Sequence, residues 1–160
     1  MKGEKLIADV NKYSKDVDMD NNAQVLVNFN KGAKGIVWTC VTAKGGVYGL
    51  RIRVYGSKGS LEWVQNDPNY LKFNPSKGAV KFLERGYTNA NFSKKFSRIK
   101  FGHPEGYLDA FANIYTEFSD YLKTNTKKRF YFPNEDEGLE TAKFIDSCKK
   151  SSQKKQWVKI

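Results

Sequence analysis

The hydrophobic pattern of this chain changes its period once, and that change restricts the possible folds more than any other feature. Between residue 6 and about residue 83, apolar residues form short runs separated by Gly, Asn and Pro, which is typical of an antiparallel meander. From about residue 104 onward, apolar residues recur every three to four positions, as they do in amphipathic helices. The change predicts an α+β protein with a large, mostly antiparallel open sheet and helices packed on one face.

The strands are expected between turn residues that tolerate a positive φ or impose a bend. They are predicted over residues 6–10, 23–29, 36–43, 47–55, 60–65, 70–73 and 80–83, with a last strand over 156–160. In the fourth strand, Leu50, Ile52 and Val54 alternate with charged and aromatic residues, so one face is apolar and the other polar. A half-polar sheet of this kind can face water or another protein.

Two helices are expected in the second half of the chain. The first covers about residues 104–123 and begins at Pro104, whose missing N–H is no loss in a first helical turn. Its apolar stripe is Leu108, Phe111, Ala112, Tyr115, Phe118 and Leu122. The second covers about residues 135–151 after Asn134 as N-cap. Its expected buried stripe is Leu139, Ala142, Ile145 and Cys148. Residues 86–100 are polar and poorly patterned, and no element is predicted there.

The size and composition favour one soluble domain. A chain of 160 residues with 39% apolar residues is expected to form a single domain over residues 1–160. No segment approaches the run of about 20 apolar residues that a membrane helix needs, and the first ten residues lack the apolar region of a signal peptide. A cytoplasmic protein without a membrane partner is therefore expected.

The net charge of +11 raises the question of a nucleic-acid partner. The cations are mostly Lys and are scattered, whereas Arg is the residue that grips phosphates bidentately. The densest cluster is Lys149, Lys150, Lys154 and Lys155, which suits the negative end of a helix dipole. Aromatic residues interleave with cations at residues 72–73 and 128–132, and core packing is favoured over base stacking for them. Nucleic-acid binding is the less favoured interpretation.

Motifs for independent chemistry are missing from the sequence. The glycines lie in turns between strands and form no phosphate-binding loop, so no cofactor is expected to bind this chain alone. A single histidine cannot supply the orienting partners of a Ser or Cys nucleophile. Cys40 and Cys148 form no CxxC pair and are interpreted as reduced, small hydrophobic residues, with no metal site. The acidic residues 135–137 are explained by their place at the start of a helix, where negative charge interacts favourably with the helix dipole.

His103 is the strongest candidate for a functional residue in this sequence. It lies beside the expected start of a helix, and ligand-facing residues concentrate at such element boundaries. An imidazole there can donate, accept or transfer a proton near neutral pH. The alternative is that His103 only caps its own turn or is exposed without a role.

Three ordered blocks resemble a known family. They cover residues 49–63 with 68–71, residues 102–107 with 110–115, and residues 137–139 with 157–158. In this order they are similar to the carboxyl-terminal domain of the glucose-fructose oxidoreductase, inositol dehydrogenase and MocA (Gfo/Idh/MocA) oxidoreductases. The resemblance extends over nearly all of the chain from Asp9 onward.

The resemblance implies a two-domain enzyme. An amino-terminal Rossmann domain, supplied in cis or in trans, would hold NAD or NADP, and a sugar-like or polyol substrate would lie between the domains. The exposed sheet face would pair subunits into a homo-oligomer. The glycine-rich loop, the catalytic Lys of a Glu-Lys-Pro segment, and an Asp and a His of the family are expected upstream of Met1 and map to no residue here. Val41 also departs from the polar residue that relatives often carry at that place.

The sequence therefore predicts a substrate-binding and oligomerisation domain that cannot transfer hydride alone. It has no catalytic, cofactor or metal residue to assign. His103 is expected to hydrogen-bond a substrate hydroxyl or carboxylate, and Tyr107 is expected one helical turn further on the same face. The alternatives are a stand-alone, sheet-based interaction module and a basic nucleic-acid-binding domain.

Overall fold

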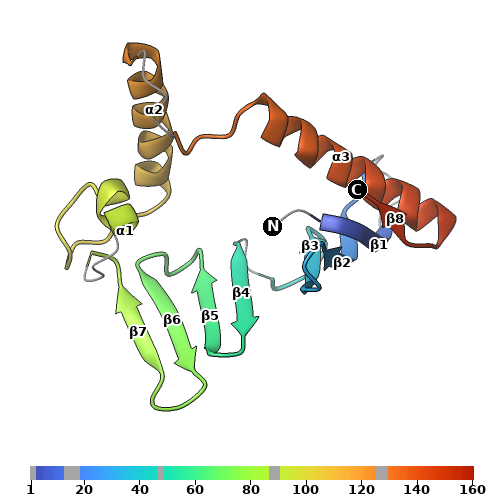
Figure 1. The fold of residues 1–160 in the computed structure, drawn as a ribbon, viewed down its shortest axis with the longest axis horizontal. Coiled ribbons are helices and arrows are strands. Elements are labelled where there is room, and N and C mark those ends of the chain that lie inside the picture. The colour runs from blue at the N-terminus through green and yellow to red at the C-terminus, as the bar shows by residue number, and fades with distance from the viewer. Residues whose placement is uncertain (1–2, 13–18, 47–48, 87–90, 125–129) are drawn as a thin grey trace. The chain divides into compact units, whose positions relative to one another are not determined.

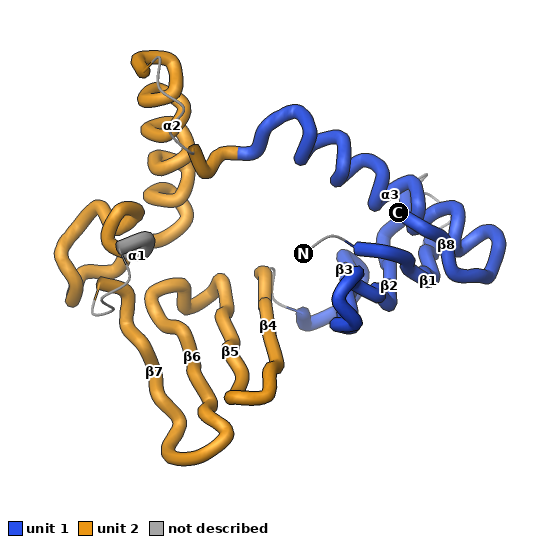
Figure 2. Tube along the Cα trace, viewed as in Figure 1, with its two compact units in different colours: residues 1–46, 133–160 blue, residues 47–132 orange. Residues whose placement is uncertain are grey.

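The computed structural model describes residues 3–12, 19–46, 49–86, 91–124 and 130–160 (Figure 1). These residues form helices and antiparallel strands that divide into two compact units (Figure 2). Unit 1 combines residues 1–46 with residues 133–160, so it is built from both ends of the chain. Unit 2 is the continuous stretch 47–132. The α+β class and the antiparallel pairing are confirmed, and the described strands form two four-stranded sheets.

Unit 1 is a sheet with one long helix against it. Its elements are β1 (Gly3–Asn11), β2 (Asn22–Phe29), β3 (Lys34–Cys40), α3 (Glu135–Lys154) and β8 (Val158–Lys159). The strand order is β3-β2-β1-β8, and all neighbours are antiparallel. The predicted N-cap of α3 is confirmed, because the side chain of Asn134 accepts a hydrogen bond from the backbone N–H of Glu137.

The core of unit 1 lies between α3 and one face of β1 and β2. It consists of Leu6, Ala8, Val25, Val27 and Cys148. The stripe predicted for α3 is wrong except at Cys148, because Leu139 and Ile145 are each 53% exposed. The helix instead buries Ser147, Cys148 and Ser151. These short side chains bring the backbone of α3 close to β1, which a stripe of Leu and Ile could not do.

Two serine hydroxyls of α3 replace a missing strand along β1. The short β8 pairs only with Lys5 and Leu6 of β1. Beyond it, the backbone N–H of Ala8 donates to Ser151 Oγ over 3.0 Å, and the backbone N–H of Val10 donates to Ser152 Oγ over 3.1 Å. Ser151 is fully buried and donates its own proton to the carbonyl of Gln156. The buried groups of the strand edge are therefore satisfied by the helix.

Ser151→Ala should destabilise unit 1 by about 1–3 kcal/mol, because it leaves a buried N–H and a carbonyl without partners. Ser152→Ala is the matched control and should cost about 1 kcal/mol or less, since Ser152 is only partly buried. Urea unfolding measures both variants, and amide hydrogen exchange at Ala8 should accelerate only in Ser151→Ala. Equal losses in the two variants would contradict the role given to Ser151.

Unit 2 is a four-stranded meander followed by two helices. Its elements are β4 (Arg51–Gly56), β5 (Gly59–Val64), β6 (Tyr70–Pro75), β7 (Lys81–Glu84), α1 (Asn91–Phe96) and α2 (Tyr107–Lys123). The sheet order β4-β5-β6-β7 follows the chain. A Cβ on Gly59 would lie 2.4 Å from the carbonyl oxygen of Asn74, and its φ is 146°, so the β4–β5 turn requires glycine.

The predicted alternation of side chains in this sheet is confirmed by its register. Ile52 pairs with Trp63, and Trp63 with Leu71, which makes one face apolar. On the other face Arg53 pairs with Glu62, and their side chains form a 3.1 Å ion pair. Because that pair is exposed, it contributes little to stability. The first two residues of the strand predicted over 47–55 lie outside the described residues, and the strand is observed from Arg51.

The helical part of unit 2 differs from the prediction in three respects. The helix α1 lies in the stretch where no element was predicted. The helix α2 begins at Tyr107 and not at Pro104. The apolar stripe of α2 is largely exposed, with Leu108 at 81% and Tyr115 at 70%. In the part of the chain that is described, no helix combines the length and the apolar character needed to cross a membrane.

Candidate functional site

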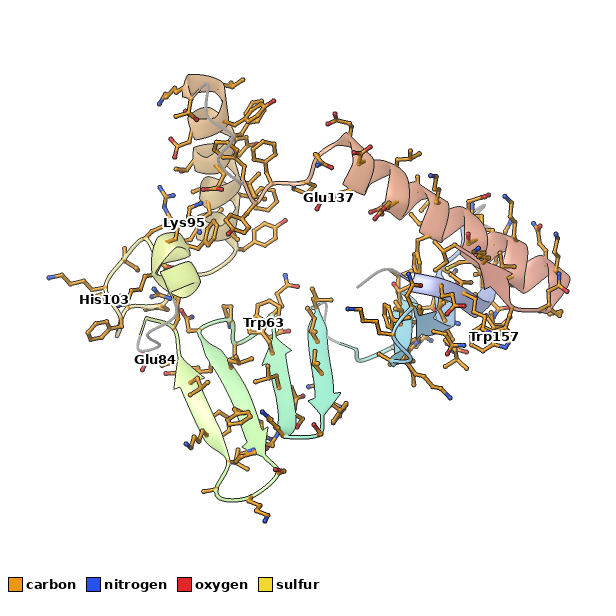
Figure 3. All side chains as sticks on the ribbon, viewed as in Figure 1. Trp63, Glu84, Lys95, His103, Glu137 and Trp157 are labelled. Atoms are coloured by element: carbon orange, nitrogen blue, oxygen red, sulfur yellow. The ribbon has the colours of Figure 1, made fainter. Side chains whose placement is uncertain are left out.

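His103 lies in a tight turn between α1 and α2. Gly102 has a φ of 83°, a left-handed conformation that glycine adopts without strain. The backbone N–H of His103 donates to the carbonyl of Lys100 over 3.3 Å and closes the turn. Figure 3 shows His103 on this loop, beyond the end of β7 where Glu84 is labelled.

The guanidinium of Arg85 attaches this turn to the end of β7. Its Nη2 donates to the carbonyl oxygen of His103 over 2.6 Å, and its Nη1 donates to the carbonyl oxygen of Ile99 over 3.3 Å. The same Nη1 lies 3.2 Å from Oε2 of Glu105. One planar, forked side chain thus fixes the loop at three points, which a Lys ammonium could not do with the same geometry.

The amide of Asn69 holds the loop from a second position, just before β6. Its Nδ2 donates to the carbonyl of Glu105, and its Oδ1 accepts from the backbone N–H of Glu105, both over 3.0 Å. The Oδ1 atom also accepts from Nε of Arg85 over 3.1 Å. The side chain of Asn69 therefore pairs with the backbone of Glu105 as a neighbouring strand would.

Glu105 is the buried centre of these contacts, with 8% of its surface exposed. Its Oε1 accepts hydrogen bonds from the backbone N–H groups of Arg98 and Ile99, while its Oε2 faces Arg85. A buried carboxylate needs partners of this kind, because burial without them is strongly unfavourable. We call Asn69, Arg85 and Glu105 the Glu105 network.

The two predicted site residues are both accessible. His103 is exposed, and within the described ranges its imidazole has no hydrogen bond or ion pair. Tyr107 is 67% exposed, and its ring lies 4.9 Å from that of Phe111. Because α2 begins at Tyr107, His103 precedes the helix, and the two residues are not one turn apart on a helical face. Their predicted roles are tested by none of these observations.

The sequence reasoning missed the whole Glu105 network. Asn69 and Glu105 lie inside the blocks that carry the family resemblance, so a signal was present for both. Arg85 lies outside those blocks and next to the stretch without pattern. An acidic residue beside a proline indicates an exposed loop, and only the three-dimensional arrangement shows that this one is buried.

A second polar cluster joins α1, α2 and the segment after α2. The ammonium of Lys95 lies 2.5 Å from Oε1 of Glu117, whose Oε2 accepts from the backbone N–H of Tyr131. The same ammonium lies 4.8 Å from the ring centroid of Tyr131 and 5.0 Å from that of Phe96. Glu117 is 5% exposed. These contacts make the cluster a structural link within unit 2.

Three of the four lysines in the basic cluster considered for nucleic-acid binding lie near carboxylates. Lys149 and Lys155 lie within 4 Å of Asp20 and Asp9, and Lys150 lies 2.6 Å from Asp146. Residues 128–129 lie outside the described residues. The aromatic side chains after them pack on α2 and not in a strand. Their ring contacts join Phe130, Phe132, Phe118 and Tyr121.

The two cysteines are free and differ in environment. Cys148 is a small hydrophobic core residue, as predicted, and burial raises the pKa of its thiol. Cys40 is only partly buried and lies outside the core of unit 1. A hydrogen bond from Thr42 lowers the pKa of the Cys40 thiol. In the described residues no group of three or more His, Cys, Asp or Glu side chains is placed to hold a metal ion.

Cys40 should therefore react with iodoacetamide before Cys148, since the thiolate is the nucleophile and a lower pKa increases its fraction below the usual thiol pKa of about 8.5. Mass spectrometry of the peptides that contain each cysteine follows both rates. Thr42→Val should slow labelling of Cys40 and leave Cys148 unchanged. A rate at Cys40 that does not respond to Thr42→Val would remove the hydrogen bond as the cause.

Comparisons with known proteins agree over almost the whole chain. A family model described as "Oxidoreductase family, C-terminal alpha/beta domain" (Gfo/Idh/MocA) matches residues 5–160. The uncharacterized oxidoreductase YfiI of Bacillus subtilis (strain 168) is 31% identical over 150 residues, in an alignment that covers 89% of this chain and 38% of that protein.

Solved structures show the same fold. An oxidoreductase from Sinorhizobium meliloti is 37% identical with a TM-score of 0.92, over 98% of this chain and 47% of that one. An inositol dehydrogenase homolog from Azotobacter vinelandii, complexed with NADH and myo-inositol, is 28% identical with a TM-score of 0.90, over 99% and 44%. The chain thus spans less than half the length of these relatives. It belongs to the Gfo/Idh/MocA oxidoreductase family and corresponds to the carboxyl-terminal α/β domain of that family.

Proposed function

We propose that this chain forms the substrate-binding side of an NAD(P)-dependent oxidoreductase that acts on a sugar-like or polyol substrate. A relative with 28% identity is described with NADH and myo-inositol, which supports a polyhydroxylated substrate. The proposal includes a cytoplasmic location, a single domain over residues 1–160 and a Rossmann domain in cis or in trans. It gives this chain no step of hydride transfer.

The observation that carries the proposal is an exposed imidazole on a backbone that is fixed around it. His103 has a hydrogen-bonded carbonyl and a hydrogen-bonded N–H, while its side chain is exposed. A neutral imidazole offers one donor and one acceptor, which matches the hydroxyls of a polyol. Tyr107 adds a phenolic hydroxyl at the first residue of α2. The proposed role of both residues is to hydrogen-bond substrate hydroxyls or a carboxylate.

The N-termini of α2 and α3 do not fit the pyrophosphate of a dinucleotide. Such a group binds at a helix N-terminus that has free backbone N–H groups and no competing negative charge. At α2 the carboxylate of Asp109 accepts from the backbone N–H of Gly106. At α3 the carboxylate of Glu137 occupies the equivalent place, and Glu135 and Asp136 add charge. NAD or NADP is therefore assigned to the part of the enzyme that carries a Rossmann domain.

The test joins this chain to the amino-terminal half of the Sinorhizobium meliloti oxidoreductase and compares His103→Ala with the parent, using myo-inositol as the probe. The KM for myo-inositol should rise about fivefold to thirtyfold, because one or two hydrogen bonds of about 1 kcal/mol each are lost. Lys100→Ala, in the same turn, is the control and should leave KM unchanged. An unchanged kcat/KM in His103→Ala, with the fold intact, would remove His103 from the site.

The second part of the proposal is self-association through the open face of the β1–β3 sheet. The core face is covered by α3, while the opposite face carries Leu26, Ile36 and Trp38, which are 47%, 78% and 65% exposed. Most homodimers use such a patch isologously and bury about 1,200 Å² or more. Sedimentation equilibrium should show a dimer that Ile36→Lys weakens and Lys31→Glu, in the β2–β3 turn, does not. Monomers alone at high concentration would refute this part.

A further inference from the structure

We infer that Glu105 is a positioning residue for His103, acting through Arg85. The inference rests on the proposed role of His103 in binding substrate, and it adds a specific residue that controls this role. Glu105 is buried, with 8% of its surface exposed, and is not itself one of the proposed substrate contacts. Its effect would be transmitted by the guanidinium that it shares with the carbonyl of His103.

The first step is that the Glu105 network binds backbone groups of the loop and forms no hydrogen bond or ion pair with the imidazole of His103. Glu105 fixes the N–H groups of Arg98 and Ile99 at the start of the loop. Asn69 fixes both backbone groups of Glu105 at its end. His103 is located between these anchors. The loop is therefore fixed on both sides of the residue whose side chain is exposed.

The second step is that an ionic network is an unusual choice if only stability were needed. A buried ion pair is often no more stabilising than apolar residues of the same volume. The advantage of an ion pair is its directional hydrogen bonding, because a carboxylate accepts and a guanidinium donates hydrogen bonds in a fixed geometry. Here the guanidinium of Arg85 donates hydrogen bonds to the carbonyl oxygen of His103 over 2.6 Å and to the amide oxygen of Asn69 over 3.1 Å. A small movement of Arg85 would therefore rotate the peptide group next to the imidazole.

The third step is that the same network fixes the position of Tyr107, the first residue of α2. Glu105 precedes the N-cap Gly106, whose N–H donates to Asp109. Holding Glu105 from Asn69 thus fixes the first turn of α2 relative to β6. His103 and Tyr107 flank Glu105 at positions two before and two after it. One buried carboxylate accordingly fixes the spacing of both proposed substrate contacts.

The decisive experiment uses the fact that His103 is the single histidine of the chain. Its imidazole gives one set of carbon and nitrogen resonances, which report its environment without any ligand. In the full chain, Glu105→Gln should shift these resonances and the amides of residues 102–104. The amides of β5 should remain in place and show that the sheet is folded. Glu62→Gln, which removes the charge from an exposed pair with Arg53, is the matched control and should leave His103 unchanged.

Two further variants keep the test decisive. Arg85→Lys keeps the positive charge but removes the forked set of hydrogen-bond donors, so it should shift the same imidazole resonances. If Glu105→Gln does not fold, this variant tests the inference in its place. In the fused enzyme, Glu105→Gln should raise KM for myo-inositol with little change in kcat. The rise should be smaller in a His103→Ala background, where only the contact of Tyr107 is left for Glu105 to position.

The outcomes separate the inference from the proposed function. Imidazole resonances that stay unchanged in folded Glu105→Gln or Arg85→Lys would overturn the inference. So would an equal rise of KM with and without His103. If His103→Ala leaves KM unchanged, the proposed substrate role fails, while the resonances still decide whether Glu105 positions His103.

Discussion

Leu6→Ala should lower the unfolding free energy of unit 1 by about 3–5 kcal/mol, the range of buried Leu→Ala substitutions that leave a cavity. Leu6 is fully buried and lies opposite Val27 in the register of β1 and β2. Together with Ala8, Val25 and Cys148 it makes up most of the core under α3. Since this core is small, one missing side chain removes a large share of its packing.

The measurement is native-state hydrogen exchange at the amides of Val25 and Val27, read against amides of β5 in the other unit. Exchange in unit 1 should accelerate, and exchange at Leu61 serves as the internal reference. Leu26→Ala is the control, because Leu26 points to the opposite face and is 47% exposed. It should cost about 1 kcal/mol or less. Equal acceleration in the two variants would show that Leu6 is not the centre of this core.

The strands could be predicted because their signals are local. Period-two alternation and turn residues identified seven strands of the meander, and the register of Arg53 with Glu62 agrees with the predicted faces. Local patterns carry no information on how strands associate beyond their neighbours. The separation into two sheets, with β8 returning from the end of the chain to pair with β1, is a long-range property.

The helices show where apolar periodicity fails. It placed α2 and α3 but selected the wrong buried face of α3. Ser147 and Ser151 are buried because α3 lies close to β1 and because Ser151 satisfies the backbone of Ala8. A scale of apolarity counts such serines as exposed. The short α1 has no long apolar repeat, and its side-chain contact to α2 through Lys95 depends on tertiary structure.

The sequence predicted the exposed residues of the candidate site but not the buried residues that hold them. His103 could be found because it is the single histidine and lies in a block that resembles the family. The residues that fix its turn come from three places in the sequence, at positions 69, 85 and 105. Each of them is a polar residue of a kind that is usually exposed. Their burial follows from the mutual satisfaction of donors and acceptors, which no single segment reveals.

The second large effect is expected at Glu117, the buried partner of Lys95. Glu117→Leu should destabilise unit 2 by about 3 kcal/mol, because it leaves the ammonium of Lys95 and the N–H of Tyr131 without this acceptor. The lower end of the usual range is expected, since the side chain of Lys95 keeps 34% of its exposure and can recover some hydration. Urea unfolding followed by the Trp63 resonance, which belongs to unit 2, measures the loss.

A double-mutant cycle separates the ion pair from simple packing. Lys95→Met combined with Glu117→Leu should recover about half or more of the loss, because apolar residues of similar volume often replace a buried pair without cost. The ammonium of Lys95 lies over the rings of Phe96 and Tyr131, and the thioether of Met also makes favourable contacts with aromatic rings. Asp146→Ala is the control, since its pair with Lys150 is exposed on both sides and should be worth about 0.5 kcal/mol or less. If the double variant is as unstable as the sum of the single variants, the two residues stabilise unit 2 independently, and the buried charge of Glu117 has another partner that matters more than Lys95.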